Sequence, residues 1–88
     1  MAKVVVYTAV PCGYCSAAIR FLREVKGQAE VEVIDLTGDM HARRDLYQRT
    51  GQRTVPQIFI NDTHIGGYDN LRRKDALGEI DSLLAQQP

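Results

Sequence analysis

Apolar and polar positions along the chain change period several times, and each change marks a predicted element. Residues 3–8 form an apolar, β-branched run, which is typical of a strand buried on both faces. From Cys15 onwards the apolar residues fall at helical spacing, and Gly27 is a natural end for this helix. The apolar stripe of this helix consists of Ala18, Phe21, Leu22 and Val25.

The middle of the chain predicts a second strand and a second helix. Residues 31–35 alternate and are rich in β-branched side chains, which favours a strand. Asp39 is a good N-cap for a helix that runs to about Arg49 and ends at Gly51. The apolar stripe of this helix is thin and consists of Met40, Ala42, Leu46 and Tyr47.

The last third predicts a hairpin followed by one helix. Residues 57–61 form a third strand, Asn61-Asp62 suits a tight turn, and residues 63–65 return as a short fourth strand. Gly66-Gly67 breaks the pattern. The final helix carries four apolar residues on one side, which are Leu77, Ile80, Leu83 and Leu84.

The predicted order is therefore strand, helix, strand, helix, strand, strand, helix. A strand–helix–strand opening implies a parallel pair with a right-handed crossover, and the later hairpin implies an antiparallel edge. We expect an α/β chain with a thioredoxin-like fold, in which three helices cover a four-stranded mixed sheet. Residues 1–88 contain no linker or repeat, so a single domain is expected.

Composition and charge narrow the class of partners. Eleven basic residues cancel eleven acidic ones, which argues against nucleic acid or a membrane surface as a partner, although a local patch stays compatible. No segment has the roughly 20 apolar residues of a transmembrane helix. The first residues lack the apolar region of a signal peptide. We expect a cytoplasmic protein in a compartment that keeps thiols reduced.

The two cysteines, Cys12 and Cys15, are separated only by Gly13 and Tyr14. So short a loop restrains the unfolded chain little, which argues against a structural disulfide. The pair lies between a predicted strand and a predicted helix, where free N–H groups and the helix dipole stabilise an anion. We expect Cys12 to be an exposed nucleophile with a lowered pKa. Cys15, one turn further into the helix, is expected to resolve the mixed disulfide formed at Cys12.

The cysteine pair also allows two simpler interpretations. Cys-x-x-Cys can be half of a zinc site, but such a site usually needs four ligands. The remaining candidates, His41 and His64, are not at zinc-finger spacing. Two inert core cysteines fit poorly, because Cys12 follows a proline in a polar turn. The position between a strand and a helix favours redox chemistry.

A second feature lies far along the chain, where Thr54-Val55-Pro56 precedes the third predicted strand. Proline there can simply mark the entrance of an edge strand. Alternatively, the bond between Val55 and Pro56 is cis, which would turn the N–H and C=O of Val55 outward, toward an extended peptide-like substrate. The residues alone leave both interpretations open.

Four segments make the chain resemble the dithiol glutaredoxins over essentially its full length. They are residues 5–8 (Val-Val-Tyr-Thr), Cys12-Gly13-Tyr14-Cys15, residues 54–60 (Thr-Val-Pro-Gln-Ile-Phe-Ile) and residues 64–69 (His-Ile-Gly-Gly-Tyr-Asp). The order and spacing of these motifs make the resemblance specific. It implies a glutathione-dependent thiol–disulfide oxidoreductase and favours the cis form of the Val55–Pro56 bond.

The resemblance also implies a binding site for glutathione, the co-substrate. Cys12 would become glutathionylated, the Val55 backbone would pair with the cysteinyl part of glutathione, and Asp69 and Asn70 would hold its γ-glutamyl end. Asp69 could also be a plain helix cap. Gly66-Gly67 could be a bare turn, or could let glutathione approach the backbone. The implied glutathione-binding set is Tyr14, Arg53, Thr54, Val55, Pro56, Gly67, Asp69 and Asn70.

Two residues depart from the usual pattern of the family. Many members carry lysine or arginine three residues before the first cysteine, where this chain has Ala9. Arg43, Arg49 or Arg53 could supply the missing charge, and Arg53 is nearest to the Thr-Val-Pro motif. A solvated surface charge is the alternative for each of them. Gly13 stands where proline is commoner, and it loosens the loop.

The resemblance leaves two competing hypotheses. In some relatives a similar loop accompanies a [2Fe–2S] cluster that bridges two subunits, and Cys12 would be the protein ligand here, together with glutathione thiols. Such a dimer would carry clusters or sense redox state. The other hypothesis is a glutathione-independent redoxin fed by thioredoxin reductase. For the favoured enzyme we expect glutathione and disulfide-containing or glutathionylated proteins as partners, and a monomer unless a cluster is bound.

Overall fold

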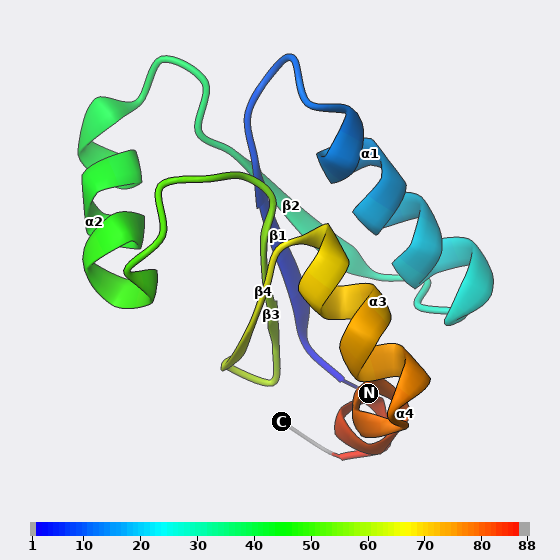
Figure 1. Cartoon of the computed structure of the whole chain (residues 1–88). Helices are drawn as coiled ribbons and strands as arrows, with labels where there is room; N and C mark the ends of the chain where they lie inside the picture. Colours follow the sequence, from blue (N-terminus) through cyan, green and yellow to red (C-terminus); the bar gives the residue numbers. More distant parts are fainter. Residues whose placement is uncertain (1, 87–88) are drawn as a thin grey trace.

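The computed structural model describes residues 2–86, which form a four-stranded mixed sheet with helices on both faces (Figure 1). Its strands are β1 (Val4–Thr8), β2 (Val31–Asp35), β3 (Gln57–Ile60) and β4 (Thr63–Gly66), in the order β2-β1-β3-β4. β1 pairs in parallel with β2 and antiparallel with β3, and β3 pairs antiparallel with β4. The predicted mixed sheet and its strand order along the chain are confirmed.

The helices divide between the two faces of the sheet. α1 (Gly13–Arg20) continues into a π-helical turn, η1 (Phe21–Val25), and packs on the same face as α3 (Tyr68–Ala76) and α4 (Glu79–Leu84). α2 (Met40–Thr50) covers the opposite face, on the left in Figure 1. Within residues 2–86 no helix is long and apolar enough to cross a membrane.

The valines of β1 alternate between two hydrophobic cores. Val4 and Val6 belong to the core under α1 and α3, whereas Val5 packs with Leu46 of α2 and Phe59 of β3. This confirms the prediction of a strand buried on both faces. Burying one such aliphatic side chain stabilises a fold by about 1.5–3 kcal/mol.

The single final helix of the prediction is wrong, because the structure has two helices there. Gly78 adopts a left-handed conformation with φ of 80°, which ends the run of α3 and begins α4 at a different angle. Leu77 is consequently 70% exposed, while Ile80 is fully buried. Four α-helices, rather than three, therefore lie in the described part of the chain.

Two residues of the other predicted apolar stripes also lie outside the cores. Val25 is 65% exposed, because η1 is wider than an α-helix: the N–H of Lys26 donates to the carbonyl of Phe21, five residues back, at 3.0 Å. The extra residue in this turn rotates Val25 off the stripe. Met40, the first residue of α2, is 79% exposed.

The central strands bring distant parts of the chain to one end of the sheet. Because β1 and β3 are antiparallel, the C-terminal end of β1 lies beside the N-terminal end of β3, and Tyr7 pairs with Gln57. The loop that leaves β1 therefore meets the loop that enters β3. The first of these loops contains Cys12, and the second contains Val55 and Pro56.

Candidate active site

Cys12 is the N-cap residue of α1, directly before the first helical turn. The backbone N–H of Cys15 donates to the sulfur of Cys12 at 3.1 Å, so the cysteine occupies the place that serine or aspartate takes in ordinary N-caps. Sulfur at this position meets unpaired N–H groups and the positive end of the helix dipole. A helix start of this kind stabilises a thiolate, which is the reactive form that the sequence predicts for Cys12.

The two cysteines differ sharply in accessibility. Cys12 is partly exposed, whereas Cys15 is 2% exposed and packs inside α1. Their sulfurs are joined in a disulfide, with Cα atoms 5.3 Å apart, a separation well suited to such a bond. The pair can therefore alternate between an internal disulfide and two thiols. Only Cys12 offers its sulfur to a molecule arriving from solvent.

The loop before β3 closes against Cys12 from the other side. The Val55–Pro56 peptide bond is cis, as the resemblance implied, and the Val55 carbonyl oxygen lies 3.8 Å from the Cys12 sulfur. Thr54 is exposed, Val55 is half-buried and Pro56 is buried. A second cis bond, between Val10 and Pro11, lies in the loop before Cys12, and it was not predicted.

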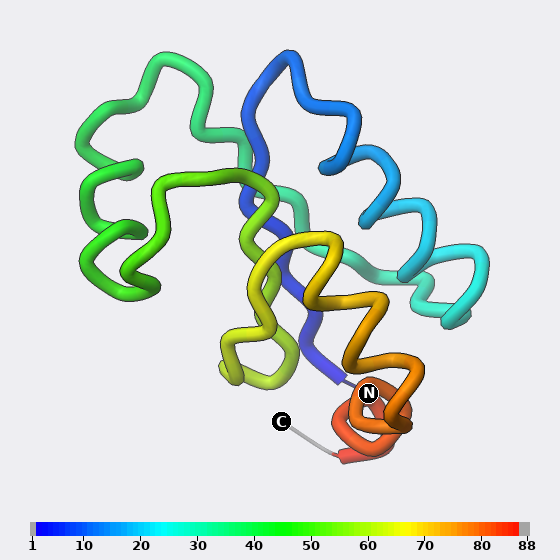
Figure 2. Tube along the Cα trace, viewed as in Figure 1, coloured from blue at the N-terminus to red at the C-terminus, as the bar shows by residue number. Residues whose placement is uncertain are grey.

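The corner between β4 and α3 forms the third side of the site. An added Cβ on Gly67 would lie 3.5 Å from the Pro56 carbonyl oxygen, and the rings of Tyr14 and Tyr68 lie 6.2 Å apart. The Gly67 N–H donates to the Asn70 side-chain oxygen at 3.1 Å. Asp69, in the first turn of α3, is exposed. Figure 2 shows these three segments at the same end of the trace.

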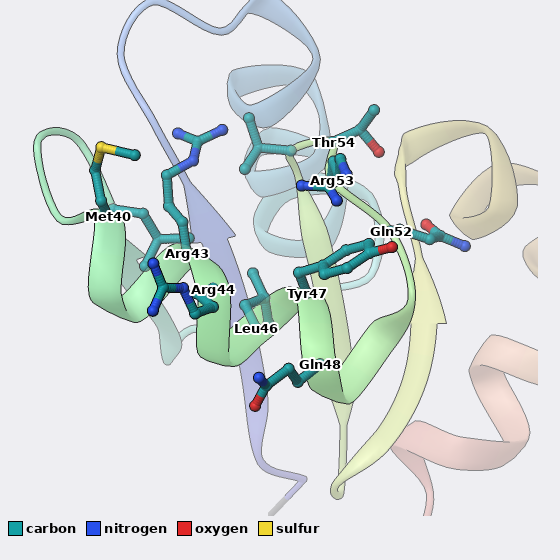
Figure 3. Close-up of a pocket in the computed structure, with 11 residues that line it drawn as sticks. Met40, Arg43, Arg44, Leu46, Tyr47, Gln48, Gln52, Arg53 and Thr54 are labelled. Atoms are coloured by element: carbon teal, nitrogen blue, oxygen red, sulfur yellow. The ribbon is translucent and has the colours of Figure 1, made fainter.

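The structure separates the three arginines that could replace the basic residue missing at Ala9. Arg43 and Arg53 line a cavity of about 510 Å³ between α2 and the loop before β3, together with Thr54 and Val55 (Figure 3). The Arg53 guanidinium lies 4.0 Å above the ring of Tyr47. Arg49 does not line this cavity.

Arg49 is engaged elsewhere, on the face of the sheet that α2 covers. Its guanidinium donates to the Tyr7 hydroxyl at 3.1 Å and lies 4.8 Å from the centre of the Phe59 ring. These contacts are those of a stacked cation that covers the edge of a hydrophobic core. Arg49 is therefore the weakest of the three candidates.

Thr37 is a site residue that sequence reasoning missed. Its hydroxyl accepts the Val10 N–H at 2.8 Å, and its own N–H donates to the Asp35 carboxylate at 2.9 Å. Hydrogen bonds from the Thr37 side chain and backbone lower the pKa of Asp35. The loop that carries Cys12 is thereby tied to the end of β2. A polar residue after a strand gives no signal of such a partner 27 residues away.

The zinc hypothesis finds no matching arrangement. In the part of the chain that the structure describes, no three His, Cys, Asp or Glu side chains come together to hold a metal ion. His64 contacts Gln57 at 2.7 Å, and His41 lies 3.5 Å from Asp45 on the exposed side of α2. Neither imidazole completes a ligand set with the cysteines.

The fold and the site define a thiol–disulfide oxidoreductase with a thioredoxin-like fold. Its nucleophile position is an N-capping cysteine that faces a cis-proline loop, and a buried cysteine follows three residues on. The glutaredoxin family model matches residues 4–65. Glutaredoxin 3 of Escherichia coli K12 is 43% identical over 84 residues, which cover 96% of this chain and 99% of that protein. A glutaredoxin of Neisseria meningitidis serogroup B is 39% identical, with coverage of 96% and 98%.

Solved structures agree with the sequence relatives. A buckwheat glutaredoxin–glutathione complex superposes with a TM-score of 0.81 at 36% identity, covering 94% of this chain and 76% of that one. The glutaredoxin of Brucella melitensis gives a TM-score of 0.79 at 38% identity, with coverage of 96% and 89%. The chain belongs to the glutaredoxin family. It is a glutathione-dependent thiol–disulfide oxidoreductase.

Proposed function

We propose that Cys12 is the nucleophile and Cys15 the resolving thiol of the glutathione-dependent reaction. The observation that carries this assignment is the 3.1 Å contact between the Cys15 N–H and the sulfur of a partly exposed, helix-capping Cys12. The Cys12 thiolate attacks the glutathione sulfur of a mixed disulfide. The bond between that sulfur and the client sulfur breaks, and the client leaves as a thiolate that takes up a proton.

Two routes then regenerate the reduced enzyme. In the monothiol route, a second glutathione thiolate attacks the glutathione sulfur bound to Cys12, releasing oxidised glutathione and the Cys12 thiolate. In the dithiol route, which suits protein disulfides, Cys12 first bonds to the client and Cys15 attacks the Cys12 sulfur. The client leaves reduced, and two glutathione molecules then reduce the Cys12–Cys15 disulfide and become oxidised glutathione.

The walls around Cys12 support an extended pose for glutathione. We assign the Val55 backbone to the cysteinyl part, with Thr54 and Pro56 beside it and Tyr14 next to the sulfur. The exposed carboxylate of Asp69 is suited to the γ-glutamyl ammonium group. Because the Asn70 side-chain oxygen already accepts the Gly67 N–H, Asn70 is expected to contribute a backbone N–H to the γ-glutamyl carboxylate.

Arg53 is the best-supported partner for the glycyl carboxylate of glutathione, with Arg43 beside it. Both line the cavity that adjoins Val55, and no ion pair engages either side chain within residues 2–86. Arg53→Gln should raise the KM for a glutathione mixed disulfide several-fold, and added salt should reduce the difference. Arg20→Gln is the control, because Arg20 pairs with Glu24 on exposed α1 surface. An equal KM in all three proteins would remove Arg53 from the site.

Two cysteine variants test the assignment of roles. Cys12→Ser is expected to abolish both reactions. Cys15→Ser should keep removing glutathione from a mixed-disulfide peptide but lose the reduction of protein disulfides, because only the second reaction needs a resolving thiol. A coupled assay with glutathione reductase measures both. An inactive Cys15→Ser beside an active Cys12→Ser would reverse the assignment.

A bridging [2Fe–2S] cluster is the second candidate function. Cys12, which caps α1 and is partly exposed, would be its protein ligand. Within residues 2–86 no three His, Cys, Asp or Glu side chains come together to hold a metal ion, so glutathione and a second subunit would have to complete the site. Anaerobic reconstitution with iron, sulfide and glutathione should then give a brown dimer. A colourless monomer would contradict this function.

The chemistry of the site also suggests the protein clients, the oligomeric state and the compartment. We propose disulfide-containing and glutathionylated proteins as clients, a monomer in the absence of a cluster, and a reducing cytoplasmic compartment. Sedimentation of the reduced, cluster-free protein tests whether it is a monomer, and a single 9.9 kDa species is the expected result.

A further inference from the structure

Gln57 is the one polar residue that is fully buried within residues 2–86. It is the first residue of β3, directly after Pro56. A buried amide left without partners would cost about 1–3 kcal/mol, so its partners define its role. Its nitrogen donates to the Thr54 carbonyl oxygen at 2.9 Å, to the Thr54 hydroxyl at 3.3 Å and to the side-chain oxygen of Gln52 at 3.0 Å.

The other end of the amide is held by His64 of β4. The Gln57 side-chain oxygen lies 2.7 Å from Nε2 of His64. Because the Thr54 carbonyl can only accept, the amide nitrogen must face it, and the oxygen must face the imidazole. His64 therefore carries its proton on Nε2. Burial, and then the charge of Arg49, lower the pKa of His64 and favour the neutral imidazole.

The segment that Gln57 holds is the one that faces the reacting sulfur. Residues 51–56 lie between α2 and β3 and belong to no helix or strand. Thr54 is one peptide bond from Val55, whose carbonyl oxygen lies 3.8 Å from the Cys12 sulfur. The buried amide thus supplies hydrogen bonds that a strand ladder would otherwise supply, next to the backbone groups assigned to glutathione.

We propose that Gln57 is a positioning residue for glutathione, which sets the Thr54–Val55 backbone at its distance from Cys12, and that His64 holds the other end of its amide. This inference rests on the proposed pairing between Val55 and glutathione. Gln57 touches neither Cys12 nor Cys15 among its hydrogen-bond partners. Its loss therefore weakens substrate binding and leaves the nucleophile as reactive as before.

The first test replaces Gln57 by methionine, which keeps the approximate length but removes the donor and the acceptor. Gln57→Met should raise the KM for a glutathione mixed-disulfide peptide about tenfold, with kcat changed less than about threefold. The rate at which iodoacetamide alkylates Cys12 in the reduced protein should stay within about twofold. Ile58→Val is the matched control, because it thins the core at the next residue of β3 and should leave KM unchanged.

His64→Phe provides a second variant should Gln57→Met fail to fold. Phenylalanine keeps the aromatic contact with Phe59, now 5.1 Å between ring centres, but no longer donates to the amide. A KM increase of at least about threefold is expected. An unchanged KM in folded Gln57→Met or His64→Phe overturns the inference, as does a Cys12 alkylation rate that falls as KM rises. A wild-type protein that does not turn over the peptide would instead contradict the proposed function.

Discussion

The backbone N–H of Cys15 donates to the sulfur of Cys12, 3.1 Å away, so the buried cysteine contributes a hydrogen bond to the partly exposed one. The polypeptide stabilises negative charge on one sulfur through the peptide group of the other. The asymmetry between two residues of the same type is thus a property of the helix terminus.

This asymmetry predicts selective modification of the reduced protein. At pH 7, iodoacetamide should alkylate Cys12 faster than it alkylates free glutathione, because the helix terminus favours the thiolate. Cys15 should react only after unfolding, since it is 2% exposed. Mass spectrometry of peptides after short exposure measures both rates. Equal labelling of the two cysteines in the folded protein would contradict this account.

Thr37 offers a test of how the Cys12 loop is held. Thr37→Val removes the acceptor for the Val10 N–H and should lower the free energy of unfolding by about 0.5–1 kcal/mol, with a several-fold loss of turnover. Thr37→Ser keeps the hydroxyl and should behave like the wild type. Chemical denaturation and the coupled assay measure the two effects. If serine and valine behave alike, the hydroxyl does not hold the loop.

Gly66 is predicted to be intolerant of any side chain. Its φ is 111°, and an added Cβ would lie 2.6 Å from the Asn70 side-chain oxygen that caps Gly67. Gly66→Ala should therefore lose about 2–4 kcal/mol of stability, from the backbone conformation and from the displaced cap together.

Gly78→Ala is the matched control for Gly66→Ala. Gly78 also has a positive φ, of 80°, but an added Cβ meets nothing within 4 Å. The control should lose only the backbone cost, about 1–2 kcal/mol. Urea denaturation of both variants separates the two contributions. Equal losses would mean that the Asn70 side chain moves aside without cost.

The lowered pKa of His64 predicts a loss of stability in mild acid. Unfolded His64 takes up a proton as the pH falls through about 6.5, whereas folded His64 does so only at lower pH. The unfolded state therefore gains protons first, and the free energy of unfolding falls below pH 6.5 until the folded histidine is also protonated. The lowered pKa of Asp35 acts in a separate window, below about pH 4.

Urea denaturation between pH 7.5 and about pH 4.5 tests this linkage. His64→Phe should flatten the fall in the free energy of unfolding, because the variant has no ionisable side chain at position 64. His41→Phe is the control, since His41 lies on the exposed side of α2. A wild-type profile as flat as that of His64→Phe would remove His64 from the acid response.

Sequence alone predicts the parts of this molecule that follow from local rules. The alternating contacts of Val4, Val5 and Val6 follow from the two-residue period of a strand, and the roles expected at Cys12 follow from the chemistry of a helix start. The prediction for Leu77 was wrong because the helical spacing of apolar residues continues across Gly78, where the left-handed conformation starts a new helix. The glycine itself was the available signal.

The supports behind the site could not be predicted in the same way. Gln57 reads as an ordinary strand residue, and Thr37 as an ordinary loop residue. Their partners come from other segments, such as His64 for Gln57 and Val10 for Thr37. Only the assembled sheet brings these groups together. The cis form of the Val55–Pro56 bond was only partly predictable. The residues alone left it open, and the family resemblance favoured it.

The antiparallel pairing of β1 with β3 has a consequence for local and global opening of the structure. Cys12 and Val55 are 43 residues apart in sequence, yet each follows or precedes one of the two innermost strands. The ladder between those two strands joins Val6 to Ile58, both fully buried. Amide protons of these strands should exchange with solvent only through global opening. The loops that carry the reactive sulfur and its facing carbonyl are thus anchored to the last cooperative unit to come apart.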